Sequence, residues 1–288
     1  MSVRTYSANL LTGWESIFYG FMEDRDGVID KYNRNVVQSF NNMIRVKSAV
    51  FDVDFDDWGI TQTKWTKFTG QYCDIPALHA WVKNARNCKT YDSLYQFKSV
   101  RAHYEGGKAV HQWGSCLLAL SFRRQPKPNL TFYTRAQSIG FSGVADYGLL
   151  HFVAKEIAKV LRVPQEKIGA TIYCTNFVFK PVEGIQLLAR RGKLEEYLQT
   201  EGRMVEAIKY YLRYFDSTDG TLAWRAANRF RHKWRQYEAG IRRPLIVDRL
   251  TLRGWPTLEQ QWIDGHNRRT HRETQQFVLT RQPKGHAG

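Results

Sequence analysis

Residues 114–122 read Gly-Ser-Cys-Leu-Leu-Ala-Leu-Ser-Phe, and residues 130–135 read Leu-Thr-Phe-Tyr-Thr-Arg. Both runs are short and largely apolar, which predicts two strands, with Cys116 at the mouth of the first and Arg135 at the end of the second. The residues between them, Pro126 to Asn129, suit a hairpin turn. Such a hairpin would place Arg135 beside Cys116, which lies nineteen residues earlier in the chain.

This pairing has a chemical meaning. A cysteine is a nucleophile only as its thiolate, and a fixed guanidinium nearby stabilises that anion while still reaching a phosphate. The pattern therefore predicts a catalytic thiol at Cys116 with Arg135 as its electrostatic partner. The alternative is a buried structural cysteine, which is the common state of a single thiol.

The order of residues around Cys116 resembles that of the thymidylate synthase family, which includes the pyrimidine nucleotide hydroxymethylases. In that family a strand with the nucleophilic cysteine precedes a strand that ends in arginine, and eleven residues later comes an asparagine that reads the pyrimidine. This chain has Asp146 at that place, followed by Tyr147 and Gly148 where a helix would start. The resemblance spans residues 94 to 191 and implies an α+β fold of the thymidylate synthase type, a mixed sheet flanked by helices.

The resemblance implies a reaction at C5 of a pyrimidine. In the family reaction the thiolate adds to C6, which makes C5 a nucleophile toward a one-carbon unit carried by 5,10-methylenetetrahydrofolate. Cys116 would be the nucleophile. Arg135 would hold both the thiolate and the nucleotide phosphate by charge-assisted hydrogen bonds.

Asp146 is the clue to the base. The family's asparagine can donate to O4 of uracil and accept from its N3 hydrogen, whereas cytosine presents a donor at C4 and an acceptor at N3. A carboxylic acid can match cytosine, and deoxycytidylate hydroxymethylases of the family carry this aspartate. The resemblance therefore implies hydroxymethylation of dCMP or CMP. Alternatively, Asp146 is displaced by one residue and serves as a helix N-cap.

Further positions follow from the resemblance as substrate-binding candidates. Lys98 lies where a family arginine reaches a phosphate across the dimer, and Arg34 lies where the family has a phosphate-binding loop. Ser138 replaces a folate-contacting aspartate, Tyr147 follows the base-reading position, and Asn176 lies where a histidine binds the sugar. A dimer-spanning phosphate site implies a homodimer.

The family's catalytic glutamate has no counterpart. The segment from Phe51 to Tyr72 is too short for the helix that usually carries it, and nothing marks Glu15 or Glu23 as a replacement. Two rival functions therefore stay open: a dUMP methylase, dUMP hydroxymethylase or divergent relative, and a basic protein that binds nucleic acid.

Composition gives the setting. The chain has 288 residues, a net charge of +16 and four cysteines without metal-ligand spacing. It has no apolar run long enough to cross a membrane and no apolar signal core at residues 1–6. These features favour a reduced, cytoplasmic setting, which for a viral protein is the host cytoplasm, with no metal site.

The charge is concentrated in the last part of the chain. Residues 223–288 hold 14 Lys and Arg against 5 Asp and Glu, interleaved with tryptophans. Such a segment can bind nucleic acid, or it can form a helical packing face with solvated arginines. A turn at Asp216 to Gly220 suggests a catalytic domain at 1–220 and a basic, aromatic-rich extension at 221–288 that is partly helical and disordered at its end. We also expect a strand at residues 49–55 and a helix at 187–215 that breaks near Gly202.

Overall fold

The computed structural model forms two compact units, residues 1–252 and 253–288. The residues that it describes are 4–23, 28–30, 36–55, 58, 60–88, 93–98, 103–105, 108–111, 116–180, 183–185, 188, 193–202, 205–206, 208–209, 246–249 and 251–256. The first unit thus continues past the expected domain boundary at 220, which itself lies outside the described residues. Most of the basic extension lies outside them too, so nucleic-acid binding by it stays a prediction.

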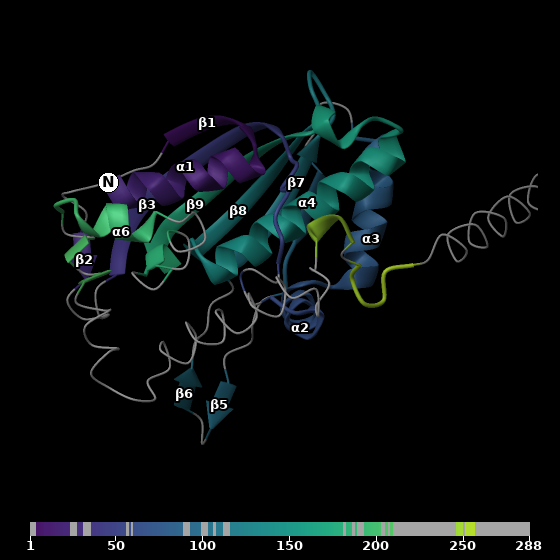
Figure 1. Ribbon diagram of the computed structural model, residues 1–288. Coiled ribbons are helices and arrows are strands. Elements are labelled where there is room, and N and C mark those ends of the chain that lie inside the picture. The colour runs from purple at the N-terminus through teal and green to yellow at the C-terminus, as the bar shows by residue number, and fades with distance from the viewer. Residues whose placement is uncertain are drawn as a thin grey trace, which may run out of the picture. The chain divides into compact units, whose positions relative to one another are not determined.

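A mixed sheet forms the centre of the first unit (Figure 1). Its strand order is β1-β3-β9-β8-β7-β4, and β2 also pairs with β3. The β1/β3 and β8/β9 pairs are parallel, and the other pairs are antiparallel. The strands are β1 (Arg4–Asn9), β2 (Val28–Asp30), β3 (Val36–Ser48), β4 (Ser93–Gln96), β7 (Leu117–Arg123), β8 (Asn129–Ser138) and β9 (Gly169–Phe179). A separate ladder joins β5 (His103–Glu105) to β6 (Lys108–His111).

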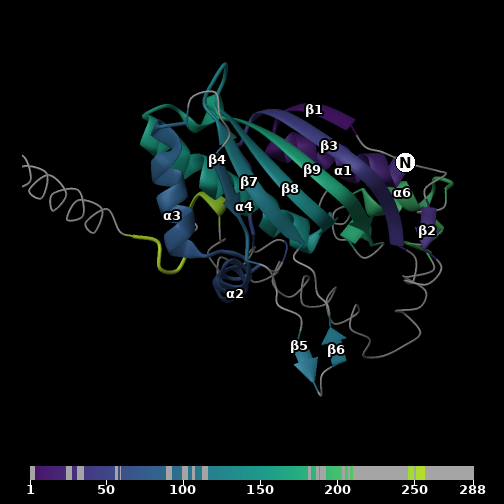
Figure 2. The ribbon, with the colours of Figure 1, turned by 180° about the vertical axis from the view of Figure 1, so that it is seen from behind.

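Helices α1 and α4 lie against one face of the sheet, and Figure 2 shows the sheet from its other face. The predicted fold class, α+β with a mixed sheet flanked by helices, is confirmed. The helices are α1 (Leu10–Glu23), α2 (Gln62–Tyr72), α3 (Ile75–Lys83), α4 (Phe141–Leu161) and α6 (Leu194–Leu198), with short 3₁₀ turns η2 (Asn84–Arg86), η3 (Gln165–Lys167) and η4 (Val247–Arg249).

Local sequence explains where α2 and α3 begin. The Thr61 hydroxyl accepts a hydrogen bond from the backbone N–H of Lys64 at 3.4 Å, and the Asp74 carboxylate accepts one from Ala77 at 3.1 Å. These are the side-chain caps that helix N-termini prefer. Pro76 in the first turn of α3 fits because no helical partner is needed there. Helix α2 ends at Tyr72, because Cys73, its C-cap, has an extended conformation.

The hairpin expected around Cys116 is present. Strands β7 and β8 pair antiparallel, with Phe122 opposite Leu130 and Leu117 opposite Thr134. The pairing ends where the backbone N–H of Arg135 donates to the carbonyl oxygen of Cys116 at 2.8 Å. The predicted adjacency of these two residues is therefore confirmed at the level of the backbone.

Part-way along three of the strands, the positions with buried side chains switch between even-numbered and odd-numbered residues. In β8 the buried side chains fall on even-numbered positions up to Thr134, and Gln137 is then buried on an odd one. In β9 the same change separates Cys174 from Phe177. Because successive side chains of a regular strand point to opposite faces, one residue in each strand must be out of phase.

That residue lies at the same level in three adjacent strands. The one-to-one register of the paired strands skips three residues: Asn41 in β3, Thr175 in β9 and Arg135 in β8. Asn41 also has a φ of 56°. An out-of-phase residue at the same level of adjacent strands re-aims the side chains that follow it. We call this level the sheet kink. It leaves Arg135 exposed and places it next to Cys116.

Three expectations about local structure are wrong. Helix α4 begins at Phe141, not at Tyr147, because the Glu183 carboxylate accepts a hydrogen bond from the N–H of Gly140 at the helix start. Asp146 is therefore inside the helix and is not its N-cap. Residues 49–55 alternate in burial as expected but make only an isolated bridge, Asp54 to Ile246. The helix expected at 187–215 is interrupted at Lys193 as well as at Gly202.

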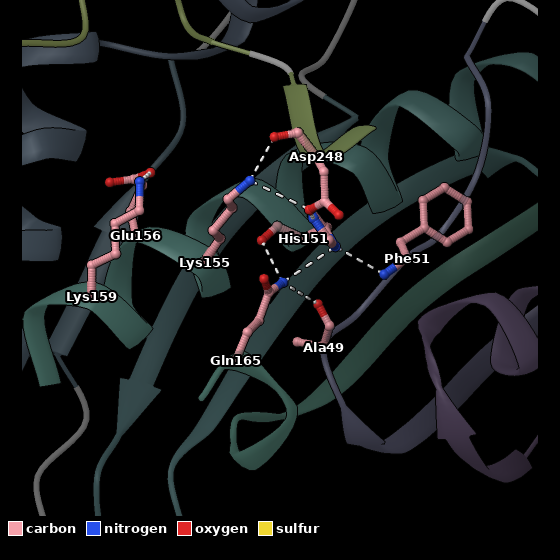
Figure 3. Close-up of polar contacts among 8 residues, drawn as sticks. All are labelled: Ala49, Phe51, His151, Lys155, Glu156, Lys159, Gln165 and Asp248. Carbon is pink, nitrogen blue, oxygen red and sulfur yellow. Dashed lines mark hydrogen bonds and ion pairs between the residues drawn. The ribbon is translucent and has the colours of Figure 1, made fainter. Parts of the chain in front are cut away.

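The turn η4, which carries Asp248, is held within the first unit by a buried histidine (Figure 3). His151 Nδ1 accepts the backbone N–H of Phe51 at 2.9 Å, so its Nε2 carries the hydrogen that Asp248 accepts at 2.8 Å. Burial lowers the pKa of His151, although Asp248 opposes this effect. The neutral ring thus links α4, the 49–55 segment and η4.

Replacing Gly148 with alanine is expected to destabilise the protein by about 1–3 kcal/mol, the usual cost of overpacking. A Cβ at this position of α4 would lie 2.2 Å from Cζ of the fully buried Phe55. Gly20→Ala in α1 is the control, because nothing lies within 4 Å of its added Cβ. That control should stabilise by about 0.5–1 kcal/mol. Urea unfolding measures both, and equal effects of the two substitutions would contradict the packing described.

Candidate active site

Cys116 differs from the other cysteines in its exposure. Cys73, Cys88 and Cys174 are buried, whereas Cys116 is half-buried at the start of β7. Burial raises the pKa of the Cys73 and Cys174 thiols to about 12, so both stay protonated at neutral pH. Accessibility and the neighbouring Arg135 make Cys116 the thiol best placed to react.

Tyr72 completes the surroundings of Cys116 and was missed by the sequence analysis. It is the last residue of α2, and its hydroxyl interacts with the Cys116 side chain. Burial, followed by the charges of Cys116 and Asp146, raises the pKa of Tyr72 to about 12, and Arg135 opposes this rise. The Tyr72 hydroxyl is therefore neutral at pH 7. The side chains of Cys116, Arg135 and Asp146 are all close enough to affect it electrostatically.

Asp146 is a buried carboxyl on α4 with one hydrogen-bond donor. Its side chain is 3% exposed, and Oδ2 accepts a hydrogen bond from Gln137 Nε2 at 2.8 Å. Burial raises the pKa of Asp146 to about 8, although the Gln137 bond lowers it. At neutral pH the group is mainly a carboxylic acid, with both a donor and an acceptor oxygen.

Cys174 and Tyr147 lie next to Asp146 on the buried side of the candidate site. Cys174 on β9 interacts electrostatically with both Asp146 and Cys116. Tyr147 is fully buried, and burial raises the pKa of its hydroxyl well above 10. That hydroxyl and Gln137 Oε1 are buried without a hydrogen-bond partner. Because unpaired buried polar atoms cost free energy, we expect each to meet a ligand or water.

Ser138 already has a partner. Its hydroxyl donates to Glu183, whose carboxylate also accepts from the backbone N–H groups of Gly140 and Lys180 at 3.2 Å. Burial raises the pKa of Glu183, while these bonds lower it. The Ser138 hydroxyl thus anchors the turn into α4, and its predicted contact with a substrate stays untested.

The remaining sequence candidates are distributed around this core. Lys98 is exposed and its Nζ donates to the carbonyl of Gly70 at 3.3 Å, near the end of α2. Asn176 is half-buried on β9, and its side-chain Oδ1 is buried without a hydrogen-bond partner. Arg34 lies outside the described residues. The structure therefore brings together Cys116, Arg135 and Asp146 and adds Tyr72 and Gln137.

The part of the chain that the structure describes lacks both a metal-ligand cluster and a membrane-spanning helix. Within it, no three histidine, cysteine, aspartate or glutamate side chains are grouped so that they could ligate a metal ion. Within it also, no helix has the length and apolarity that a membrane crossing requires.

Comparisons with known proteins give little further information. No protein-family model matches the sequence, and no curated protein matches it. Among solved structures, the thymidylate synthase from T4 phage is similar to this chain with a TM-score of 0.35 and 12% sequence identity. The match covers 69% of this chain and 91% of that chain. A similarity of this size supports no conclusion about function, so the case for a function rests on the residues around Cys116.

Proposed function

We propose that this protein modifies C5 of a cytosine nucleoside monophosphate, dCMP or CMP, and that the product is the C5-hydroxymethyl nucleotide. The observation that supports this most strongly is the grouping of an accessible thiol, an arginine and a buried carboxylic acid at the sheet kink. A thiol beside a cation can add to an electron-poor double bond. A buried acid can read the polar edge of a base.

The chemical step begins with the sulfur of Cys116. Its thiolate forms a bond to C6 of the ring, and the electrons of the C5–C6 double bond move toward C5 and the ring carbonyl system. Arg135 stabilises the thiolate before the addition and binds the nucleotide phosphate. The neutral Tyr72 hydroxyl, which interacts with the Cys116 side chain, is placed to donate a hydrogen bond to the anion. The activated C5 is then ready to attack a one-carbon electrophile.

The base is held by Asp146. As a carboxylic acid it donates to N3 of cytosine and accepts from the 4-amino group. A proton donated toward N3 also stabilises the ring as the sulfur adds. Uracil presents a hydrogen at N3 and an oxygen at C4, which is the opposite pattern.

The residues of this chain say less about the one-carbon donor than about the base. The resemblance implies 5,10-methylenetetrahydrofolate, but the position where the family contacts folate through a carboxylate is Ser138, and its hydroxyl is bonded to Glu183. The described residues therefore do not fit the folate as the family binds it. Folate use stays a prediction of the resemblance.

A homodimer is part of the proposal. None of the described helices covers the second face of the sheet (Figure 2). Five large apolar side chains on its strands are exposed, and all except the first adjoin a buried position: Tyr6, Phe40, Leu94, Leu118 and Tyr173. Exposed apolar surface of this extent is typical of a protein interface. Sedimentation should show a dimer that Leu118→Glu dissociates, and a wild-type monomer at micromolar concentration would exclude it.

Release of tritium from C5-labelled nucleotides tests the proposal. We expect release from dCMP or CMP, measured with and without methylenetetrahydrofolate, and slower release from dUMP. Asp146→Asn should move the preference toward uracil by about 1–3 kcal/mol, the size of one mismatched buried hydrogen-bond pair. Release from dUMP alone by the wild type would show that the assignment of cytosine to Asp146 is wrong.

A further inference from the structure

A carboxylic acid alone does not distinguish cytosine from uracil. It carries one O–H donor and one C=O acceptor, and the proton can sit on either oxygen. With the proton on the oxygen that faces N3, the acid pairs with cytosine. With the proton on the other oxygen, the same acid donates to O4 of uracil and accepts from its N3 hydrogen. Discrimination therefore needs a neighbour that holds the proton on one oxygen.

Gln137 is placed to be that neighbour. Its Nε2 donates to Oδ2 of Asp146 at 2.8 Å, so Oδ2 is the acceptor oxygen of this contact. A proton on Oδ2 would point at the donor group of Gln137, which is unfavourable. The proton of the acid is therefore held on Oδ1. Since burial raises the pKa of Asp146 to about 8, this protonated form dominates at neutral pH.

The position of Gln137 is rigid. Its side chain is 1% exposed, and its backbone pairs with Phe177 of β9 just beyond the sheet kink. The change of parity at the kink turns Gln137 toward the helix side, where Asp146 lies on the second turn of α4. Without the kink, the residue at 137 would point to the opposite face.

From this geometry we propose that Gln137 is a specificity-determining positioning residue: it fixes the proton of Asp146 on Oδ1 and, with Oδ1 directed toward N3 of the base, selects the cytosine edge over the uracil edge. The inference rests on the proposed function, because it concerns the base that this function requires. Gln137 acts through Asp146 and need not touch the nucleotide.

The test compares the affinities of dCMP and dUMP for wild type and Gln137→Met, measured by calorimetry at pH 7. Methionine has nearly the same volume but cannot donate to Asp146. Wild type should bind dCMP about 10- to 100-fold more tightly than dUMP, as one mismatched buried pair gives. In Gln137→Met this ratio should fall to within about threefold, because either oxygen can then carry the proton. Gln165→Met, which removes hydrogen bonds to Ala49 and His151, is the matched control and should keep the wild-type ratio.

The outcomes separate this inference from the proposed function. A wild-type preference for dCMP that Gln137→Met retains would refute the role of Gln137 and leave the proposed function standing. If the wild type binds neither nucleotide, both proposals fail. The infrared C=O band of Asp146, assigned with Asp146→Asn, gives a reading without nucleotide. It should shift in Gln137→Met and not in Gln165→Met, and an unshifted band would also refute the positioning role.

Discussion

Replacing Cys116 with serine should reduce turnover of the preferred cytosine nucleotide by at least about 1,000-fold, because a serine hydroxyl is not ionised at neutral pH and is a poor nucleophile toward C6. Nucleotide affinity should stay within about threefold of wild type, since the phosphate and the base are held by other residues. Tritium release measures turnover, and calorimetry measures affinity.

Two variants serve as controls for this experiment. Cys88→Ser changes a buried thiol whose sulfur bonds the Asn84 carbonyl in the turn after α3, and it should leave turnover unchanged. Arg135→Ala should lose both turnover and affinity, because the guanidinium serves thiolate and phosphate together. Full activity of Cys116→Ser would refute the nucleophilic role, whatever the other variants do.

Asp146→Asn should make the protein more stable above pH 4, by an amount that grows with pH and reaches up to about 4 kcal/mol at pH 7. The folded-state pKa of Asp146 is raised from 3.8 to about 8 by burial. Between these two values the folded protein holds a proton that the unfolded chain has released, so wild-type stability falls as pH rises. An asparagine has no proton to lose, and it can still accept the Gln137 hydrogen bond.

Urea unfolding of both proteins from pH 4 to pH 8 checks this. The two should be closest in stability near pH 4 and separate steadily until about pH 8. Asp248→Asn is a useful comparison, because the pKa of this mostly exposed carboxyl is lowered by its bonds to His151 and Lys155, although burial opposes them. The stability that the Asp248 carboxylate gives to the wild type should instead be lost as pH falls, because its folded-state pKa is lowered. A difference between Asp146→Asn and wild type that does not change with pH would contradict the raised pKa.

The part of the site that local sequence determines was predictable. Two apolar runs and a turn between them are enough to bring Arg135 to Cys116, since a hairpin needs no information from elsewhere in the chain.

The parts that depend on distant residues were not predictable. Tyr72 reaches Cys116 only because α2 packs near the start of β7, and no motif in residues 62–72 marks its last residue. The start of α4 depends on Glu183, some forty residues later in the chain. The partnership of Gln137 with Asp146 needs the sheet kink, whose change of parity is visible only when the burial of each strand is known.

The kink also limits how this chain can change its length. Deleting Thr175 alone would remove the out-of-phase residue of β9 but not those of β3 and β8, so β9 would lose its one-to-one register with both neighbours on one side of the kink. An insertion or deletion is therefore tolerable at this level only when all three strands change together. A gap placed between Arg135 and Ser138 in any alignment with distant relatives is physically implausible, whereas the loop at Pro126 to Asn129 can absorb one freely.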